Sequence, residues 1–234
     1  MKTIRTPYLL AALGGAAFLL AGALVSVSLL GSKSSTPKAT AAPLLGVGDA
    51  LSLFEGIPQH GTTLGSPKAP VTVAEYADLQ CPYCARFNSD ELPAFVQRYV
   101  RTGKAKLEFR GLAFVGPDSE SGLRTVLAAS SQNRLWQMVD ILYRNQGAEN
   151  SGWLSDALLR QVGAAVSGLS IERMISERPG SSVDSLVQKA AGQAQNDGVN
   201  GTPTLFAGPS GGTLQRVDSS AAALARAVDA ALAA

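Results

Sequence analysis

Cysteine and histidine are scarce in this chain, whose 234 residues include two cysteines and one histidine. A structural zinc site takes about four ligands, usually cysteine or histidine, so Cys81, Cys84 and the upstream His60 are too few. A purely structural disulfide between the two cysteines would close a very short loop and gain little entropic stabilisation. We therefore predict no metal and no cofactor and expect the thiol pair to be used chemically; a metal site and a structural disulfide are the alternatives.

Clusters of like charge are also absent. The chain has 20 Lys and Arg residues against 18 Asp and Glu, and two of the basic residues, Lys2 and Arg5, lie in the first thirty positions. The rest of the chain therefore has 18 basic and 18 acidic residues, and the basic ones are scattered along it. This distribution indicates neither a nucleic-acid footprint nor a polybasic membrane surface.

One long apolar segment, residues 8–30, contains no charged residue. About twenty apolar residues span a bilayer, whereas the core of a cleaved signal peptide is typically about 7 to 15 residues. Lys2 and Arg5 precede the segment, so the positive-inside rule predicts a cytoplasmic N-terminus at 1–7, a single-pass signal anchor at 8–30 and an exported catalytic domain. A cleaved signal is the alternative, because residues 39–41 are small and suitably spaced. No cysteine directly follows the apolar run, which argues against a lipoprotein anchor.

Residues 31–62 are rich in Ser, Thr, Pro, Ala and Gly, which predicts a flexible tether. Within it, residues 44–54 contain enough Leu and Val to form a short docking element. The remaining part of the chain is long enough for one domain with a core of its own, or for one domain that carries an insertion.

The pattern of apolar residues in this part predicts an α/β domain interrupted by helices. A strand at 71–76, a helix kinked at Pro93 and a strand at 104–110 predict two parallel strands with a right-handed crossover. The expected helices that follow are at 122–131, 135–145, 155–166, 171–177 and 182–197, with Asp118 or Ser119 and Ser155 as N-caps. A hairpin of 204–207 with 213–217 and a last helix capped by Ser219 complete the pattern. We divide the domain into 63–117, a helical insertion at 118–184, and 185–234.

The two cysteines lie where a strand ends and a helix begins, in the sequence Cys81-Pro82-Tyr83-Cys84. Unpaired backbone N–H groups and the helix dipole favour a thiolate at the first turn of a helix. The first cysteine of such a pair can have its pKa lowered to roughly 3.5 to 7.5. We therefore predict that Cys81 is the nucleophile and Cys84 the resolving thiol.

Three segments together resemble the thioredoxin superfamily, and the helical insertion resembles its DsbA-like branch. They are residues 65–84, which contain the cysteine pair, the Leu-Trp-Gln-Met-Val-Asp segment at 135–140, and Gly-Val-Asn-Gly-Thr-Pro-Thr at 198–204. The resemblance spans roughly residues 62–217. It implies an α/β thioredoxin fold with an inserted all-helical subdomain, here preceded by the transmembrane segment.

The resemblance also implies roles for single residues. Pro203 matches the family's cis-proline, which lies beside the cysteine pair, and Thr202 would offer backbone groups to an extended substrate. Glu75 matches a buried acid below the active site, where a raised pKa would let it exchange a proton with Cys84. An ordinary trans proline and an exposed strand residue are the respective alternatives.

Pro82 and Tyr83, between the cysteines, would tune the redox potential. DsbA-like proteins often have His at the second of these positions, and Cys-Pro-Tyr-Cys is shared with glutaredoxins. The resemblance implies an extracytoplasmic thiol-disulfide oxidoreductase that forms disulfides in exported proteins with free thiols and is reoxidised by a quinone-coupled membrane protein. The alternatives are a reductase or isomerase fed by a membrane electron donor, and a non-catalytic peptide-binding module.

Overall fold

A six-stranded mixed sheet organises the part of the chain that the computed structural model describes, residues 42–233. The strand order is β1-β2-β4-β3-β5-β6. The central strand, β3 (Val71–Ala77), pairs in parallel with β4 (Ala105–Gly111) and antiparallel with β5 (Thr204–Pro209). The predicted parallel pair is therefore confirmed. All seven residues of β3 are buried, as expected for a strand that has helices on both faces.

Short strands form both edges of the sheet. On one side β1 (Gln59–His60) and β2 (Thr63–Leu64) form a small antiparallel pair, and β2 joins β4. On the other side β6 (Gln215–Val217) pairs with β5, which confirms the predicted hairpin.

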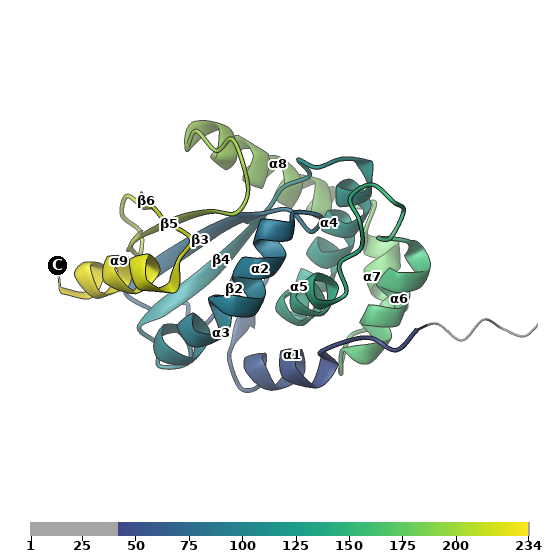
Figure 1. Ribbon diagram of the computed structural model, residues 1–234, viewed down its shortest axis with the longest axis horizontal. Helices are drawn as coiled ribbons and strands as arrows, with labels where there is room; N and C mark the ends of the chain where they lie inside the picture. Colours follow the sequence, from purple (N-terminus) through teal and green to yellow (C-terminus); the bar gives the residue numbers. More distant parts are fainter. Residues whose placement is uncertain (1–41, 234) are drawn as a thin grey trace, which may run out of the picture. The chain divides into compact units, whose positions relative to one another are not determined.

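Different helices cover the two faces of β3 (Figure 1). Val73 and Ala77 face the main hydrophobic core, which also contains residues of α2 (Pro82–Asp90). Ala74 and Tyr76 belong to a second cluster with residues of α8 (Ser181–Asn196). Helix α8 runs through the predicted boundary at residue 184, and its C-terminal half packs on the sheet, so this boundary divides one helix.

The predicted helix after the cysteine pair is interrupted. Helix α2 ends at Asp90, and α3 (Leu92–Phe95) continues into a π-helical turn, η1 (Val96–Val100). Pro93 lies at the start of α3, where its missing N–H leaves no helical hydrogen bond unmade. The proline therefore starts a new helix instead of kinking a continuous one.

The helical insertion is present and lies beside one end of the sheet (Figure 1). Its helices before α8 are α4 (Pro117–Ser130), α5 (Leu135–Arg144), α6 (Asp156–Ala165) and α7 (Ile171–Glu177). Ser155 caps α6 as predicted, since its hydroxyl accepts from Leu158 N at 3.3 Å.

Two other cap predictions are wrong. Helix α4 begins earlier than expected, so Asp118 and Ser119 lie inside its first turn and their side chains bind other segments. In the last helix, α9 (Ala221–Ala233), Ser220 rather than Ser219 accepts from a first-turn N–H, that of Ala223.

The folded unit begins before residue 63, so the predicted tether extends too far. The expected docking element forms α1 (Val47–Phe54), which buries Ala50, Leu53 and Phe54. Arg101 holds the end of α1 by donating to the backbone carbonyls of Leu53 and Glu55. Burial of these apolar side chains outweighs the flexible composition of the segment.

The predicted cytoplasmic N-terminus and signal anchor, residues 1–7 and 8–30, lie outside the described residues. Among the residues that are described, no helix is both long enough and apolar enough to cross a membrane.

Candidate active site

The cysteine pair lies at the start of α2, where β3 leads into the helix. Cys81 is the N-cap and Pro82 the first helical residue, a position that suits proline because its fixed φ is already helical. The Cys81 carbonyl accepts from the backbone N–H of Cys84 and of Ala85, both at 3.1 Å. Both cysteines are free thiols. Local sequence therefore places Cys81 at the helix terminus, as predicted.

Cys81 has the environment of a reactive thiol. Its Sγ donates to the backbone carbonyl of Thr202 at 3.1 Å. The pKa of Cys81 is lowered to about 6, chiefly by a hydrogen bond with the Cys84 thiol and further by hydrogen bonds with the Thr202 side chain and with the backbone N–H groups of Cys84 and Tyr83. These contacts outweigh the effect of burial, which acts in the opposite direction.

Cys84 is fully buried in the main core. Its burial raises its pKa, and the neighbouring charges of Cys81 and Glu75 raise it further. Two thiols of one pair therefore differ strongly in acidity, because one lies at the helix terminus and the other lies inside the first turn.

Glu75 lies in the middle of β3 and is 2 % exposed. Its backbone neighbours in the sheet are Phe109 and Leu205. Burial raises its pKa to about 8, and Oε1 has no hydrogen-bond partner among the described residues. The structure thus excludes the interpretation of Glu75 as an exposed strand residue, and at neutral pH the buried side chain is a carboxylic acid.

Thr202 and Pro203 lie next to the cysteine pair in space. Thr202, which contacts Cys81, comes 121 positions after it in the chain. The peptide bond between Thr202 and Pro203 is cis. Pro203 and Tyr83 line a groove of about 190 Å³ next to α2, together with Arg86, Phe87, Glu91, Ser219 and Ser220. The Tyr83 side chain is 68 % exposed, so it contributes an aromatic surface at the mouth of the site.

Asp78 is completely buried and holds a neighbouring loop. Its carboxylate accepts from the backbone N–H groups of Phe114 and Val115 at 2.6 and 2.9 Å and from the Ser119 hydroxyl at 2.7 Å. Helix α2 has no side-chain N-cap hydrogen bond.

Sequence reasoning missed two residues of α5 and its C-terminal end, Tyr143 and Gln146. Both donate to backbone carbonyls within residues 78–81. No local pattern identifies them, because they lie more than sixty positions away from the carbonyls that they bind.

His60 is exposed at the sheet edge, and among residues 42–233 no three His, Cys, Asp or Glu side chains are grouped to hold a metal.

A family model described as thioredoxin matches residues 59–230. The chain belongs to the thioredoxin family. Its relatives include a probable disulfide bond formation protein D from Bacillus cereus, which is 29 % identical over 147 residues, covering 62 % of this chain and 68 % of the relative.

Two solved structures share the thioredoxin-like fold. A thioredoxin-like oxidoreductase from Silicibacter pomeroyi superposes with a TM-score of 0.61 at 25 % identity, covering 80 % of this chain and 98 % of the other. Oxidised BdbD from Bacillus subtilis gives a TM-score of 0.66 at 22 % identity, covering 74 % and 94 %. The predicted thioredoxin-like α/β fold is confirmed.

We expect the two thiols to be alkylated at very different rates. In the reduced protein at pH 7, iodoacetamide should modify Cys81 first, because its lowered pKa makes it largely thiolate, and should leave buried Cys84 unmodified. Peptide mass spectrometry after a timed quench measures both sites. In urea the two rates should become similar. Equal rates in the folded protein would contradict the assignment of Cys81 as the nucleophile.

Proposed function

We propose that this protein is an extracytoplasmic thiol-disulfide oxidoreductase that forms disulfides in exported proteins. The observation that carries the proposal is the contrast between the two thiols: Cys81 has a pKa of about 6 at the helix terminus, whereas Cys84 is buried with a raised pKa. A stabilised Cys81 thiolate favours the reduced pair and so makes the oxidised pair a stronger oxidant. The names of the Bacillus relatives support the same activity.

In the oxidising direction, a substrate thiolate attacks Cys81 Sγ of the Cys81–Cys84 disulfide. The new bond joins the substrate to Cys81, and Cys84 leaves with the electron pair of the broken bond. A second substrate thiolate then attacks the substrate sulfur of this mixed disulfide and releases Cys81 as a thiolate. The substrate has lost two electrons and two protons, and the active-site pair has gained the electrons.

Glu75 supplies a proton where Cys84 needs one. Cys84 has a raised pKa, so it leaves readily only if it is protonated on release. Glu75 is protonated at neutral pH. It lies close enough to Cys84 that its negative charge, once it ionises, raises the pKa of the Cys84 thiol. Glu75, whose pKa is about 8, then takes up a proton from solvent at neutral pH.

The substrate would lie along the backbone at Thr202 and Pro203. The Thr202 carbonyl already contacts Cys81 Sγ, so a chain joined to that sulfur must pass this edge. The groove between Pro203 and Tyr83 would take the neighbouring side chains. Pro82 and Tyr83, as the residues between the thiols, would tune the potential.

We further propose that residues 8–30 anchor the protein in the membrane with its catalytic domain outside the cytoplasm. The segment is uncharged and long enough to span a bilayer, with Lys2 and Arg5 on its N-terminal side. A quinone-coupled membrane oxidase would then be the natural reoxidant. Exported proteins with free thiols would be the substrates.

The redox state of the pair in cells distinguishes an oxidase from a reductase. We expect acid-quenched thiol trapping to find Cys81 and Cys84 mostly oxidised, because an oxidase rests in the form that accepts electrons. Wild-type protein reduced with dithiothreitol before trapping carries the alkylating group on both thiols and marks the position of reduced protein on the gel. A mostly reduced pair would overturn the proposed direction in favour of a reductase or isomerase.

A further inference from the structure

We propose that Gln146 is a positioning residue of the active site, which fixes the backbone before Cys81 and thereby sets the reactivity of the Cys81 thiol. The inference deepens the proposed function by assigning this task to the helical insertion. Gln146 follows the end of α5, so a residue of the insertion controls a thiol of the thioredoxin-like part.

The Gln146 side chain bridges the backbone carbonyls of Leu79 and Cys81. Its Nε2 donates to the Leu79 carbonyl at 2.8 Å and to the Cys81 carbonyl at 3.2 Å. Tyr143, one helical turn earlier, donates from its buried hydroxyl to the Asp78 carbonyl at 3.2 Å. Three side-chain hydrogen bonds from the end of α5 thus hold residues 78–81.

These carbonyls belong to the turn that orients Cys81. The Cys81 N–H donates to the Asp78 carbonyl, and the Cys81 carbonyl accepts the first hydrogen bonds of α2. The thiolate is stabilised by hydrogen bonds that include the N–H groups of Tyr83 and Cys84, and these act over short distances. A change in the Cys81 backbone would move Sγ away from these donors.

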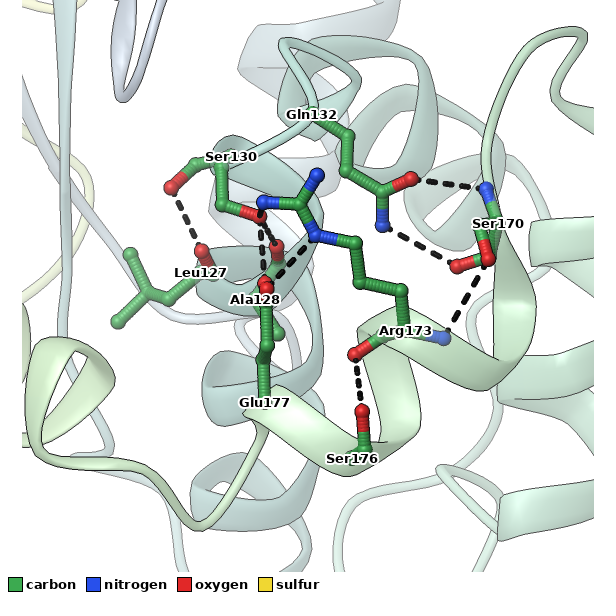
Figure 2. A network of polar contacts seen from close by, with 9 residues as sticks. Leu127, Ala128, Ser130, Gln132, Ser170, Arg173, Ser176 and Glu177 are labelled. Atoms are coloured by element: carbon green, nitrogen blue, oxygen red, sulfur yellow. Dashed lines mark hydrogen bonds and ion pairs between the residues drawn. The ribbon is translucent and has the colours of Figure 1, made fainter.

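The insertion contains another glutamine that joins two segments and lies away from the cysteine pair. Gln132 makes a two-point contact with Ser170, in which Nε2 donates to the Ser170 carbonyl at 3.1 Å and Oε1 accepts from its N–H at 2.8 Å (Figure 2). Figure 2 shows this pair beside Arg173 and Glu177, with neither cysteine among the contacts. Gln132 is therefore a matched control for the loss of a structural glutamine.

The test compares Gln146→Met, which keeps a side chain of similar length but removes the donor, with Gln132→Met. The Cys81 pKa is measured in each reduced protein from thiolate absorbance at 240 nm as a function of pH. We expect Gln146→Met to raise the Cys81 pKa by about one unit, which corresponds to about a tenfold lower thiolate fraction below the pKa. Gln132→Met should leave the Cys81 pKa unchanged, even if it lowers the unfolding temperature by as much as Gln146→Met does.

The surrounding titratable groups do not obscure this measurement. Cys84, Tyr143 and Glu75 face Cys81 from α2, α5 and β3, and each has a raised pKa, so all three remain protonated while Cys81 titrates near pH 6. The titration also needs no client protein or redox partner, so its result is separate from whether the protein works as an oxidase.

Tyr143→Phe provides a second variant that removes a single hydroxyl and can be used if Gln146→Met folds poorly. It should raise the Cys81 pKa in the same direction by a smaller amount. An unchanged Cys81 pKa in folded Gln146→Met, or in Tyr143→Phe when only that variant folds, would overturn the inference. An equal rise in Gln132→Met would also overturn it, because the effect would then follow general loosening of the insertion.

Discussion

Cys84→Ala protein should accumulate mixed disulfides with client proteins in cells, whereas Cys81→Ala protein should accumulate none. Without Cys84, a mixed disulfide that forms when the Cys81 thiolate attacks a client disulfide cannot be resolved by the active-site partner and persists. Cys84 lies in the apolar core, so alanine at this position preserves the packing better than a polar residue would. Non-reducing gels, with and without dithiothreitol, would show the adducts as slow bands that the reductant removes.

The reciprocal variant provides the control for this experiment. In Cys81→Ala the remaining thiol is buried with a raised pKa and does not reach an incoming disulfide. Turnover should fall to background in both variants, so only trapping separates the two roles. Comparable adducts on Cys81→Ala would mean that Cys84 can act as the nucleophile.

Glu75→Gln should remove a pH dependence of stability from the oxidised protein. Burial raises the folded pKa of Glu75 from 4.5 to about 8, so the folded state binds more protons than the unfolded state between these values. Stability is therefore full below about pH 4.5 and falls as pH rises to about 8, by on the order of 4 kcal/mol. Urea unfolding at pH 5 and pH 8.5 measures the difference.

The oxidised protein is chosen because its two cysteines are joined in a disulfide and do not titrate. In the reduced protein, the lowered Cys81 pKa contributes stability that is present above about pH 9 and is lost as pH falls through about 6, which opposes the Glu75 effect. Glu55→Gln, on an exposed side chain, is the matched control and should keep the wild-type dependence. A Glu75→Gln protein whose stability still fell from pH 5 to pH 8.5 would show that Glu75 is not the group responsible.

The features that depend on local chemistry could be predicted from the sequence. The run of β-branched and aromatic residues before Cys81 and the helical pattern after it place the thiol at a helix terminus, because helix starts are defined by a few neighbouring backbone groups. The same reasoning predicted the parallel pair β3 and β4, the hairpin of β5 with β6, and the Ser155 cap. It was less accurate at Pro93, where we predicted a kink in one helix and the structure has the start of a new one. The two outcomes differ only in whether the preceding helix ends before the proline.

What only the tertiary structure decided are the contacts between segments distant in the chain. A lone acid in strand β3 is either exposed or buried depending on which helices cover that face, and the fold buries Glu75 beside Cys84. The Thr202 carbonyl reaches Cys81 because β5 lies next to β3, and Gln146 reaches the same residue because α5 packs beside α2. Sequence alone predicted which residue is the reactive thiol, because that prediction rests on the helix start. The acidity of the thiol depends on donors and apolar surroundings that only the tertiary fold brings together.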